Sequence, residues 1–180
     1  MELKASDLNA VCVARGPGSY TGLRVGVSVA KGLCMALDIP LLSLSSLEAL
    51  AWSVADFAFQ VDACICPMID ARRMEVFTQL FDYQLHSTSE PIALIVEENA
   101  FQEELAKGNI LFVGDGAAKC GPILSQHPNA FVLGDRVSSA ASMGKAAQAK
   151  FESGDHEDLV TFEPFYLKEF VATLQKKKVL

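Results

Sequence analysis

At 180 residues, of which 51% are hydrophobic and 21% charged, the chain is long and apolar enough to bury a packed core. Its formal net charge of -7 argues against a protein that grips a nucleic-acid backbone by itself, because such binding depends on clusters of lysine and arginine. No apolar run reaches the roughly 18 residues of a membrane span, and the N-terminus lacks a signal-peptide pattern, so we expect a cytoplasmic protein without membrane contact.

The start of the chain predicts a strand, a glycine-rich turn and a helix. Residues 8–14 (LNAVCVA) form an apolar run of strand length. Residues 21–37 are apolar around most of a helix, and either Ser19 or Thr21 suits its N-cap position. The sequence DIP at 38–40 ends the helix, because the residue before a proline avoids the helical conformation.

A second strand and a second helix come directly afterwards. Residues 41–44 are mostly apolar, and residues 45–57 place Ser45 and Glu48 at the spacing of a capping box ahead of an apolar helical face. The order strand, helix, strand, helix predicts a parallel sheet covered by helices, which is an α/β fold.

A hairpin is predicted next. The apolar residues 63–69 are separated by the turn DARR (70–73) from residues 75–83, which alternate with the two-residue period of a strand. Asp70 stands at a strand end, where α/β sheets open into ligand sites. As an alternative, its carboxylate serves only the turn itself.

The rest of the chain predicts shorter elements and repeats one earlier pattern. The predicted elements are a helix at 98–107, a strand at 110–113, a helix at 138–151 and an extended segment at 163–167. The strand at 110–113 runs into Gly114-Asp115-Gly116, much as the first strand runs into a glycine turn. This weak internal echo predicts two related α/β halves.

The turn GPGSYTG allows three interpretations. A glycine loop before a helix suits a phosphate, which Gly16, Gly18, Ser19 and Thr21 would contact. Its spacing fits neither a dinucleotide loop nor a P-loop, which needs lysine where Leu23 stands. A nucleophile elbow around Ser19 needs a glycine where Thr21 stands. The third interpretation is a tight strand-to-helix turn with Ser19 as the cap.

The cysteines and histidines show no metal-ligand spacing. Cys64 and Cys66 are separated by one residue rather than two, and most of the five cysteines lie in apolar runs. We therefore expect buried free thiols in a reducing compartment, and we predict neither a metal site nor a catalytic residue.

The helix at 21–37 carries more apolar surface than one sheet covers. Its polar residues Arg24, Ser28 and Lys31 form a single narrow stripe. Small residues recur at every fourth position from Gly22 and let a second helix approach closely. That cover is either a helix of the same chain or a partner protein. The predicted partner-interface residues are Gly22, Leu23, Gly26, Val29, Ala30 and Leu33.

Five segments resemble, in order, the signature of the bacterial TsaB (YeaZ) family. They are GPGSYTGLRVGVSVAKGL (16–33), DIPLLSLSSLEALA (38–51), IDARRMEVF (69–77), GDGA (114–117) and EPFYL (163–167). Their combination is far more specific than any one of them, and it spans nearly the whole chain. The resemblance implies an actin-like, two-lobed fold of the ASKHA, ribonuclease H-like class.

The resemblance also implies a role in making threonylcarbamoyladenosine beside the tRNA anticodon. The chain would be a non-catalytic scaffold that pairs through first-lobe helices with the transferase TsaD, which holds metal and nucleotide, while an ATPase, TsaE, joins the complex. The resemblance implies no cofactor bound by this chain alone, although ATP or ADP can bind at the complex interface. It implies that tRNA is contacted only through the complex. A homodimer is another assembly that the family allows. The competing interpretations are an actin-like ATPase or kinase and a glycoprotease-like peptidase that uses Ser19.

The family pattern begins before the segment that this chain resembles first. Family members open with a strand carrying an Asp-Thr-Ser-like motif, two further strands and a helix, whereas residues 1–14 resemble the linker and strand after that helix. The resemblance therefore implies a truncated first lobe with a dimerisation helix at 1–58 and a second lobe at 59–180. Without those strands, the strand at 11–13 would carry an unpaired edge, and the helix at 21–37 would form half of the usual docking surface.

Overall fold

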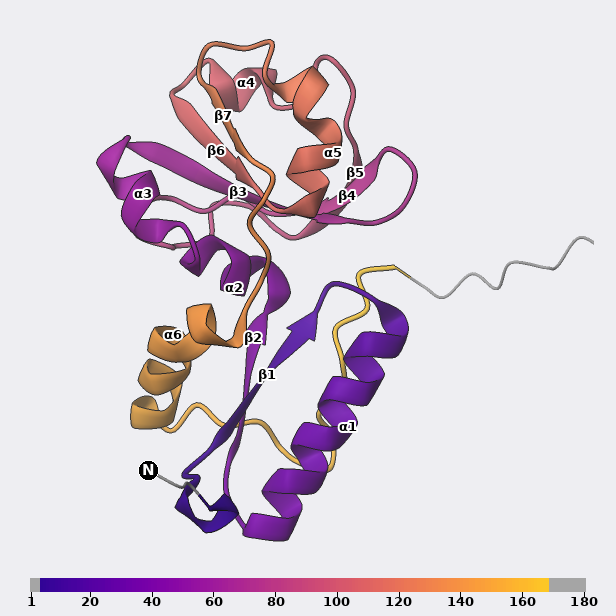
Figure 1. Ribbon diagram of the computed structural model, residues 1–180, viewed down its shortest axis with the longest axis vertical. Helices are drawn as coiled ribbons and strands as arrows, with labels where there is room; N and C mark the ends of the chain where they lie inside the picture. Colours follow the sequence, from indigo (N-terminus) through magenta and orange to yellow (C-terminus); the bar gives the residue numbers. More distant parts are fainter. Residues whose placement is uncertain (1–3, 169–180) are drawn as a thin grey trace, which may run out of the picture.

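The computed structural model describes residues 4–168, which form two lobes (Figure 1). The smaller lobe is built on a two-stranded sheet and the larger lobe on a five-stranded sheet. The described part of the chain starts in the smaller lobe with a short 3-10 helix (Ala5–Asp7), builds the larger lobe, and then returns to the smaller one. No helix in residues 4–168 combines the length and apolar character needed to cross a bilayer.

In the smaller lobe, β1 (Val11–Gly16) and β2 (Leu41–Ser45) pair in parallel and are joined by α1 (Tyr20–Leu37). The Ser19 hydroxyl caps α1 by accepting a hydrogen bond from the N–H three residues later, at 3.3 Å. The helix ends at Asp38, which adopts the left-handed conformation. The predicted strand, turn, helix and strand are therefore confirmed.

The larger lobe has the strand order β5-β4-β3-β6-β7. Its strands are β3 (Ala63–Asp70), β4 (Glu75–Thr78), β5 (Ile92–Ile95), β6 (Asn109–Val113) and β7 (Ala130–Leu133). β6 pairs in parallel with β3 and β7, whereas β4 pairs antiparallel with β3 and β5. The hairpin that we expected around DARR is confirmed as the β3–β4 connection.

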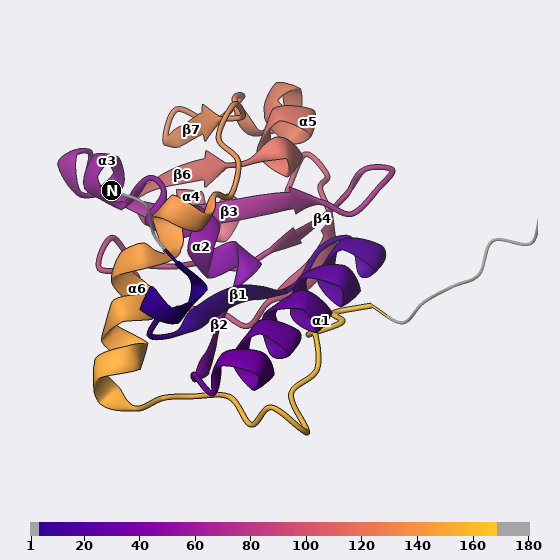
Figure 2. The same ribbon diagram turned by 60° about the horizontal axis from the view of Figure 1, so that its bottom comes forward.

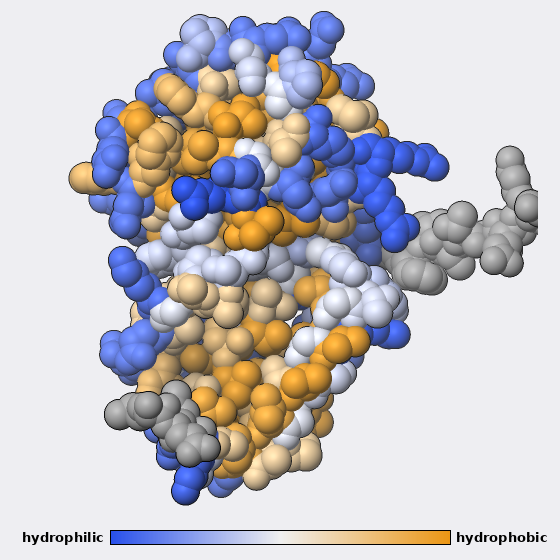
Figure 3. Space-filling view, viewed as in Figure 1, coloured by the Kyte–Doolittle hydropathy of each residue, from blue (hydrophilic) through white to orange (hydrophobic). Residues whose placement is uncertain are grey.

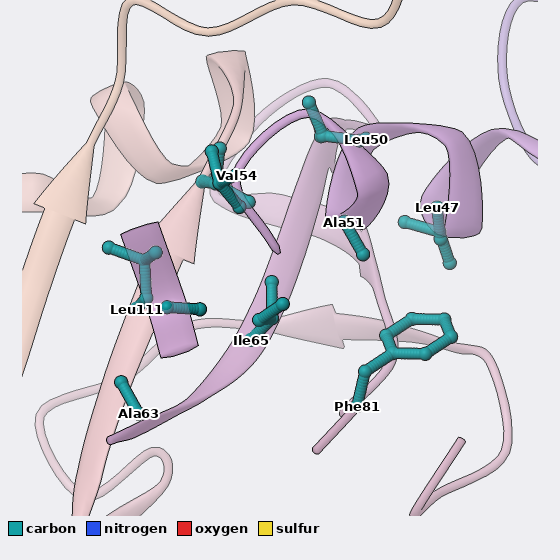
Figure 4. Close-up of a cluster of buried hydrophobic side chains, with 10 residues drawn as sticks. Leu47, Leu50, Ala51, Val54, Ala63, Ile65, Phe81 and Leu111 are labelled. Carbon is teal, nitrogen blue, oxygen red and sulfur yellow. The ribbon is translucent and has the colours of Figure 1, made fainter. Parts of the chain in front are cut away.

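Two short helices follow β2: α2 (Ser46–Trp52) lies between the sheets and contacts β1, β2 and β3, whereas α3 (Ala55–Gln60) covers β3. We expected one helix over 45–57, but Val54 leaves the helical conformation and divides it. Ser45 caps α2 through the Leu47 N–H. The buried cluster beneath these helices, shown in Figure 4, includes Leu47, Leu50, Ala51, Val54, Ala63, Ile65, Phe81 and Leu111.

After β7 the chain returns to the smaller lobe. The helix α6 (Ala140–Ser153) packs against β2 and α2, and its buried Met143 and Ala146 contact Leu44 and Ala49. The smaller lobe therefore completes its core with a helix from the far end of the sequence. The division into 1–58 and 59–180 stays a prediction.

The segment 155–168, here called the strap, crosses the smaller lobe and reaches the junction of the two lobes (Figure 2). Its Glu157 N–H donates to the carbonyl of the first residue of β2, at 2.8 Å. Phe162 is buried in the cluster formed by α1 and the sheet. The Phe165 N–H donates to the Arg15 carbonyl at 2.7 Å. These contacts hold the strap against both β-strands and α1.

Several elements differ from the sequence prediction. The strands β5 and β7 and the helix α5 (Asp115–Leu124) were not predicted, and the expected helix at 98–107 shortens to α4 (Gln102–Leu105). Cys34, Cys66 and Cys120 are buried as expected. The expectation was wrong for Cys64, which is exposed near the start of β3, although Cys66 on the same face of this strand is buried.

Candidate functional site

A cavity of about 380 Å³ lies where the two lobes meet, and we call it the junction pocket. It is formed by the turn before α1, the β3–β4 turn and the end of the strap. Its lining residues are Gly18, Ser19, Tyr20, Thr21, Asp70, Ala71, Arg72, Phe77, Phe165, Tyr166, Leu167 and Lys168. Segments that are far apart in sequence therefore share one concave site.

Of the four predicted loop contacts, three reach the junction pocket: Gly18, Ser19 and Thr21. Gly16 does not line it. Gly16 has a φ of +120°, and a Cβ there would lie far inside van der Waals contact with the Phe165 carbonyl oxygen. Glycine is needed at this position because the strap approaches β1 closely there.

Ser19 has a structural task in this site. Its Oγ accepts the capping hydrogen bond of α1, and no histidine is among the residues that line the junction pocket. Within residues 4–168 no group of His, Cys, Asp and Glu side chains has the arrangement of a metal site. The site therefore offers hydroxyls and a helix N-terminus rather than an assembled Ser–His pair.

Asp70 organises the turn between β3 and β4. Its Oδ1 accepts hydrogen bonds from the Arg72 N–H at 2.8 Å and from the Lys119 ammonium at 2.5 Å. The hydrogen bond from Lys119 lowers the pKa of this carboxyl below its ordinary value. Of the two interpretations of Asp70, the structure displays the turn contact directly.

An aromatic stack joins α1 to the strap at the rim of the junction pocket. The rings of Tyr20 and Tyr166 lie 4.9 Å apart between centroids. The Arg24 guanidinium sits 4.6 Å from the Tyr20 ring centroid, and its Nε donates to the Tyr166 hydroxyl at 3.3 Å. Neither tyrosine was singled out from the sequence, and Arg24 was noted only as part of the polar stripe, since only the fold brings the strap to α1.

The helix α1 has three faces. Its buried face, which contacts its own sheet, carries Leu23, Val27, Ala30 and Cys34. The polar stripe of Arg24, Ser28 and Lys31 borders that face. On the other side, Val25, Val29 and Leu33 form an exposed apolar row, which we call the open face of α1; these side chains are 58%, 57% and 41% exposed.

The predicted partner-interface residues are divided between these faces. Gly22, Val29 and Leu33 lie on the exposed side of α1. Leu23 and Ala30 are buried in the smaller lobe itself, so they contact the chain's own core. Gly26 is half-buried, and a Cβ there would lie 3.8 Å from the Val13 side chain. Val25, missed by sequence reasoning, carried a signal, since Val25, Val29 and Leu33 recur at every fourth position.

The sheet beside α1 also has an open edge. Among the strands of residues 4–168, β1 pairs only with β2. Figure 3 shows hydrophobic residues gathered over the front of the smaller lobe, where β1 and α1 lie. Leu8, just before β1, is 44% exposed. The open face of α1 thus belongs to a wider apolar region.

Comparisons with known proteins agree with this architecture. A family model described as tRNA N6-adenosine threonylcarbamoyltransferase (TsaD) matches residues 1–175. The tRNA threonylcarbamoyladenosine biosynthesis protein TsaB of Bacillus subtilis is 47% identical over 83 residues, which cover 46% of this chain and 34% of that protein. TsaB of Haemophilus influenzae is 29% identical over 180 residues, covering 94% of this chain and 74% of the relative. The match therefore spans only about a third of the Bacillus protein's length.

Solved structures show the same fold. A Pseudomonas aeruginosa protein, described as uncharacterized with similarity to peptidase YEAZ, superposes with a TM-score of 0.76 at 25% identity, covering 92% of this chain and 76% of that one. YeaZ from Pseudomonas aeruginosa superposes with a TM-score of 0.71 at 24% identity, covering 92% and 77%. The actin-like α/β class is thus confirmed. The chain belongs to the TsaD-type domain family and, within it, to the TsaB (YeaZ) family.

Proposed function

We propose that this chain is a non-catalytic scaffold subunit in tRNA threonylcarbamoyladenosine biosynthesis and that it docks a TsaD-like transferase on the open face of α1. The observation that carries the proposal is that face: Val25, Val29 and Leu33 form a continuous apolar row with no cover from the described chain. Binding of a partner to such a row is favourable because it removes apolar surface from water.

The geometry of α1 favours a helix as the docking element. Gly22 and Ala36 border the apolar row and are exposed, so a second helix can approach the α1 backbone closely there. Val29 stands near the middle of the row and is expected to contribute most to binding. Leu23 and Ala30, which hold α1 on its own sheet, support the surface from behind.

The rest of the proposed assembly is taken from the family. We propose that a TsaE-like ATPase joins the complex, that tRNA is recruited through the complex, and that ATP or ADP binds at its interface rather than to this chain alone. The names support only a place in this pathway, since relatives are called TsaB biosynthesis proteins and the family model describes TsaD as the transferase. A homodimer through the same face is the competing assembly, and the cytoplasm is the proposed compartment.

The test is size-exclusion chromatography of the chain mixed with a TsaD-like partner, comparing Val29→Glu with Met35→Glu. Both substitutions place a carboxylate on the exposed surface of α1, but Met35, 72% exposed, lies on the polar side of the helix. We expect Val29→Glu to abolish co-elution and Met35→Glu to preserve it. Equal behaviour of the two variants would remove the open face from the proposal. Elution of the chain without its partner at the size of a dimer would favour the homodimer.

A second candidate function is peptide or nucleotide hydrolysis at the junction pocket. It is favoured by the position of Ser19 in that pocket and by the description of one structural neighbour as similar to a peptidase. The discriminating measurement is peptidase and ATPase activity of the purified chain and of Ser19→Ala. We expect no activity in either protein. Because Ser19 caps α1, we expect the variant to have a lower melting temperature. Activity that disappears in Ser19→Ala would overturn the scaffold role.

A further inference from the structure

The turn between β3 and β4 ends in two arginines whose charge is not balanced locally. Asp70 is paired with Lys119, and Glu75 at the start of β4 is paired with Lys168. Arg72 and Arg73 are both exposed, and neither forms an ion pair within residues 4–168. The turn is therefore a positively charged point on a chain whose net charge is -7.

A third carboxylate, that of Asp115, forms no ion pair with either arginine within residues 4–168. Asp115 Oδ1 accepts hydrogen bonds from the Asp70 N–H at 3.0 Å and from the Gly116 N–H at 2.8 Å. This carboxylate is engaged by the backbone at the start of α5. In Figure 3, hydrophilic side chains project from the larger lobe beside the junction of the two lobes.

The backbone presents both arginines in an uncommon conformation. Arg72 has a φ of +71° and Arg73 a φ of +51°, the left-handed region that side chains other than those of glycine, asparagine and aspartate rarely adopt. The Asp70 carboxylate and the hydrogen bond from the Glu75 N–H to the Arg72 carbonyl, at 3.2 Å, hold this geometry. Strained positions kept rigid in this way concentrate at sites of recognition.

The surroundings of Arg72 match a nucleotide unit in chemical character. Arg72 lines the junction pocket together with Ser19, Thr21 and the stacked tyrosines Tyr20 and Tyr166. Guanidinium and hydroxyl groups bind phosphate oxygens, and an unpaired base can extend an existing aromatic stack. An acidic peptide would use the arginines but not the rings, so the combination favours RNA.

We infer that Arg72 and Arg73 bind backbone phosphates of the tRNA that the complex modifies, with an unpaired nucleotide of that tRNA facing the junction pocket. This inference rests on the proposed function. Two phosphate contacts add affinity and register to an RNA held mainly by other subunits, which is compatible with the acidic character of the chain. The arginines then serve as positioning contacts rather than as the main anchor.

The experiment measures binding of a fluorescein-labelled tRNA anticodon stem–loop by fluorescence anisotropy over a series of salt concentrations. The proteins are the complex with a TsaD-like partner and the full chain alone. The variants are Arg72→Gln/Arg73→Gln, the charge-preserving Arg72→Lys/Arg73→Lys, and Lys145→Gln. Lys145 is a matched control because it is exposed on α6, away from the β3–β4 turn. Thermal melting of each variant confirms that it is folded.

We expect the glutamine pair to weaken RNA binding about tenfold and to lower the salt slope by about 1 to 2, while Lys145→Gln changes neither. The lysine pair should recover most of the salt slope. Co-elution with the partner should be unchanged, which separates this result from a failure of the scaffold role. If the complex does not form, the same variants are compared in the chain alone, and that comparison decides whether the two arginines bind RNA.

Three results would overturn the inference. The first is equal RNA affinity of wild type, the glutamine pair and the control, or no RNA binding by any of them. The second is displacement of the RNA by ADP, which would assign the turn to a free nucleotide. The third is loss of partner binding in the glutamine pair, which would assign the turn to the protein interface.

Discussion

The two lobes contain the same local unit in two different settings. In the smaller lobe β1 leads through Gly16 into α1 and then β2, and in the larger lobe β6 leads through Gly114 into α5 and then β7. Both strand pairs are parallel, and both glycines have a large positive φ, +120° and +114°. The weak echo of glycine turns in the sequence thus corresponds to a repeated structural unit.

The units differ in what lies on the far side of the first strand. β6 has β3 as a parallel neighbour, and a Cβ on Gly114 would collide with the Met68 carbonyl of that strand. β1 has no such neighbour among the described strands, and a Cβ on Gly16 would collide with the Phe165 carbonyl of the strap instead. One unit is closed by a strand and the other only by an irregular segment, so the smaller lobe keeps exposed apolar surface that a partner can use.

The largest expected effect is at the closed unit. Gly114→Ala forces a side chain against the Met68 carbonyl and within 2.7 Å of Leu50 Cδ2, at a φ that alanine rarely adopts. Neither neighbour can move without opening the core, so we expect the free energy of unfolding to fall by about 3 to 5 kcal/mol. Urea unfolding of the wild type and the variant measures this difference in the free energy of unfolding. A loss below about 1 kcal/mol would show that this sheet is as adaptable as the smaller lobe.

The next effect concerns the attachment of the strap. Phe162→Ala removes a buried ring from the core of the smaller lobe, which should destabilise that lobe by about 3 kcal/mol and speed hydrogen exchange in α1 about 100-fold. Exchange in β3 and β6 should change far less. Val160→Ala is the control, since Val160 is 84% exposed in the same strap. Equal acceleration in both lobes would show that they unfold as one unit.

A smaller effect is expected from the glycine of the open unit. Gly16→Ala meets the Phe165 carbonyl, but the strap lies on the surface and can shift away. We expect a loss of about 1 to 3 kcal/mol, less than at Gly114, together with faster proteolysis within the strap. Gly18→Ala is the matched control because no atom lies within 4 Å of its added Cβ. The comparison of the lobes fails if Gly16→Ala is as damaging as Gly114→Ala.

The smallest effect is electrostatic. Lys119 lowers the pKa of Asp70 below the ordinary 3.8, so this pair stabilises the fold above that pH and loses its contribution as pH falls through the lower folded-state value. Asp70 is 44% exposed, so screening limits the loss in Asp70→Asn to about 0.5 kcal/mol near neutral pH. Asp155→Asn removes a similar pair with Lys150 in the smaller lobe. Melting curves from neutral to acid pH should show both differences shrink below the ordinary pKa and disappear below the lowered folded-state pKa.

Local signals in the sequence were sufficient for part of the fold. The cap at Ser19, the stop at Asp38 and the turn at DARR depend on residues only a few positions apart, and each was predicted. The strand at Ile92–Ile95 and the strand at Ala130–Leu133 were missed because each is four residues long and carries little periodic signal.

The candidate site was predictable only in part for the same reason. The apolar excess of α1 is a local property, so its role as an exposed helix could be anticipated. Which residues of α1 face outward depends on how the helix sits on β1 and β2, so Leu23 and Ala30 were assigned to the wrong side. The junction pocket joins Thr21, Arg72 and Tyr166, and no sequence spacing encodes that meeting.

The strap also sets an order of events during synthesis. All strands of the larger lobe have left the ribosome once Leu133 has emerged, whereas the smaller lobe waits for Phe162 and Phe165. Until then the inner side of α1 lacks part of its cover while a nascent chain is still attached. A partner that engages α1 during translation would therefore meet a half-built lobe, because the strap, which is made after the strands of both sheets, is the segment that fixes the helix in place.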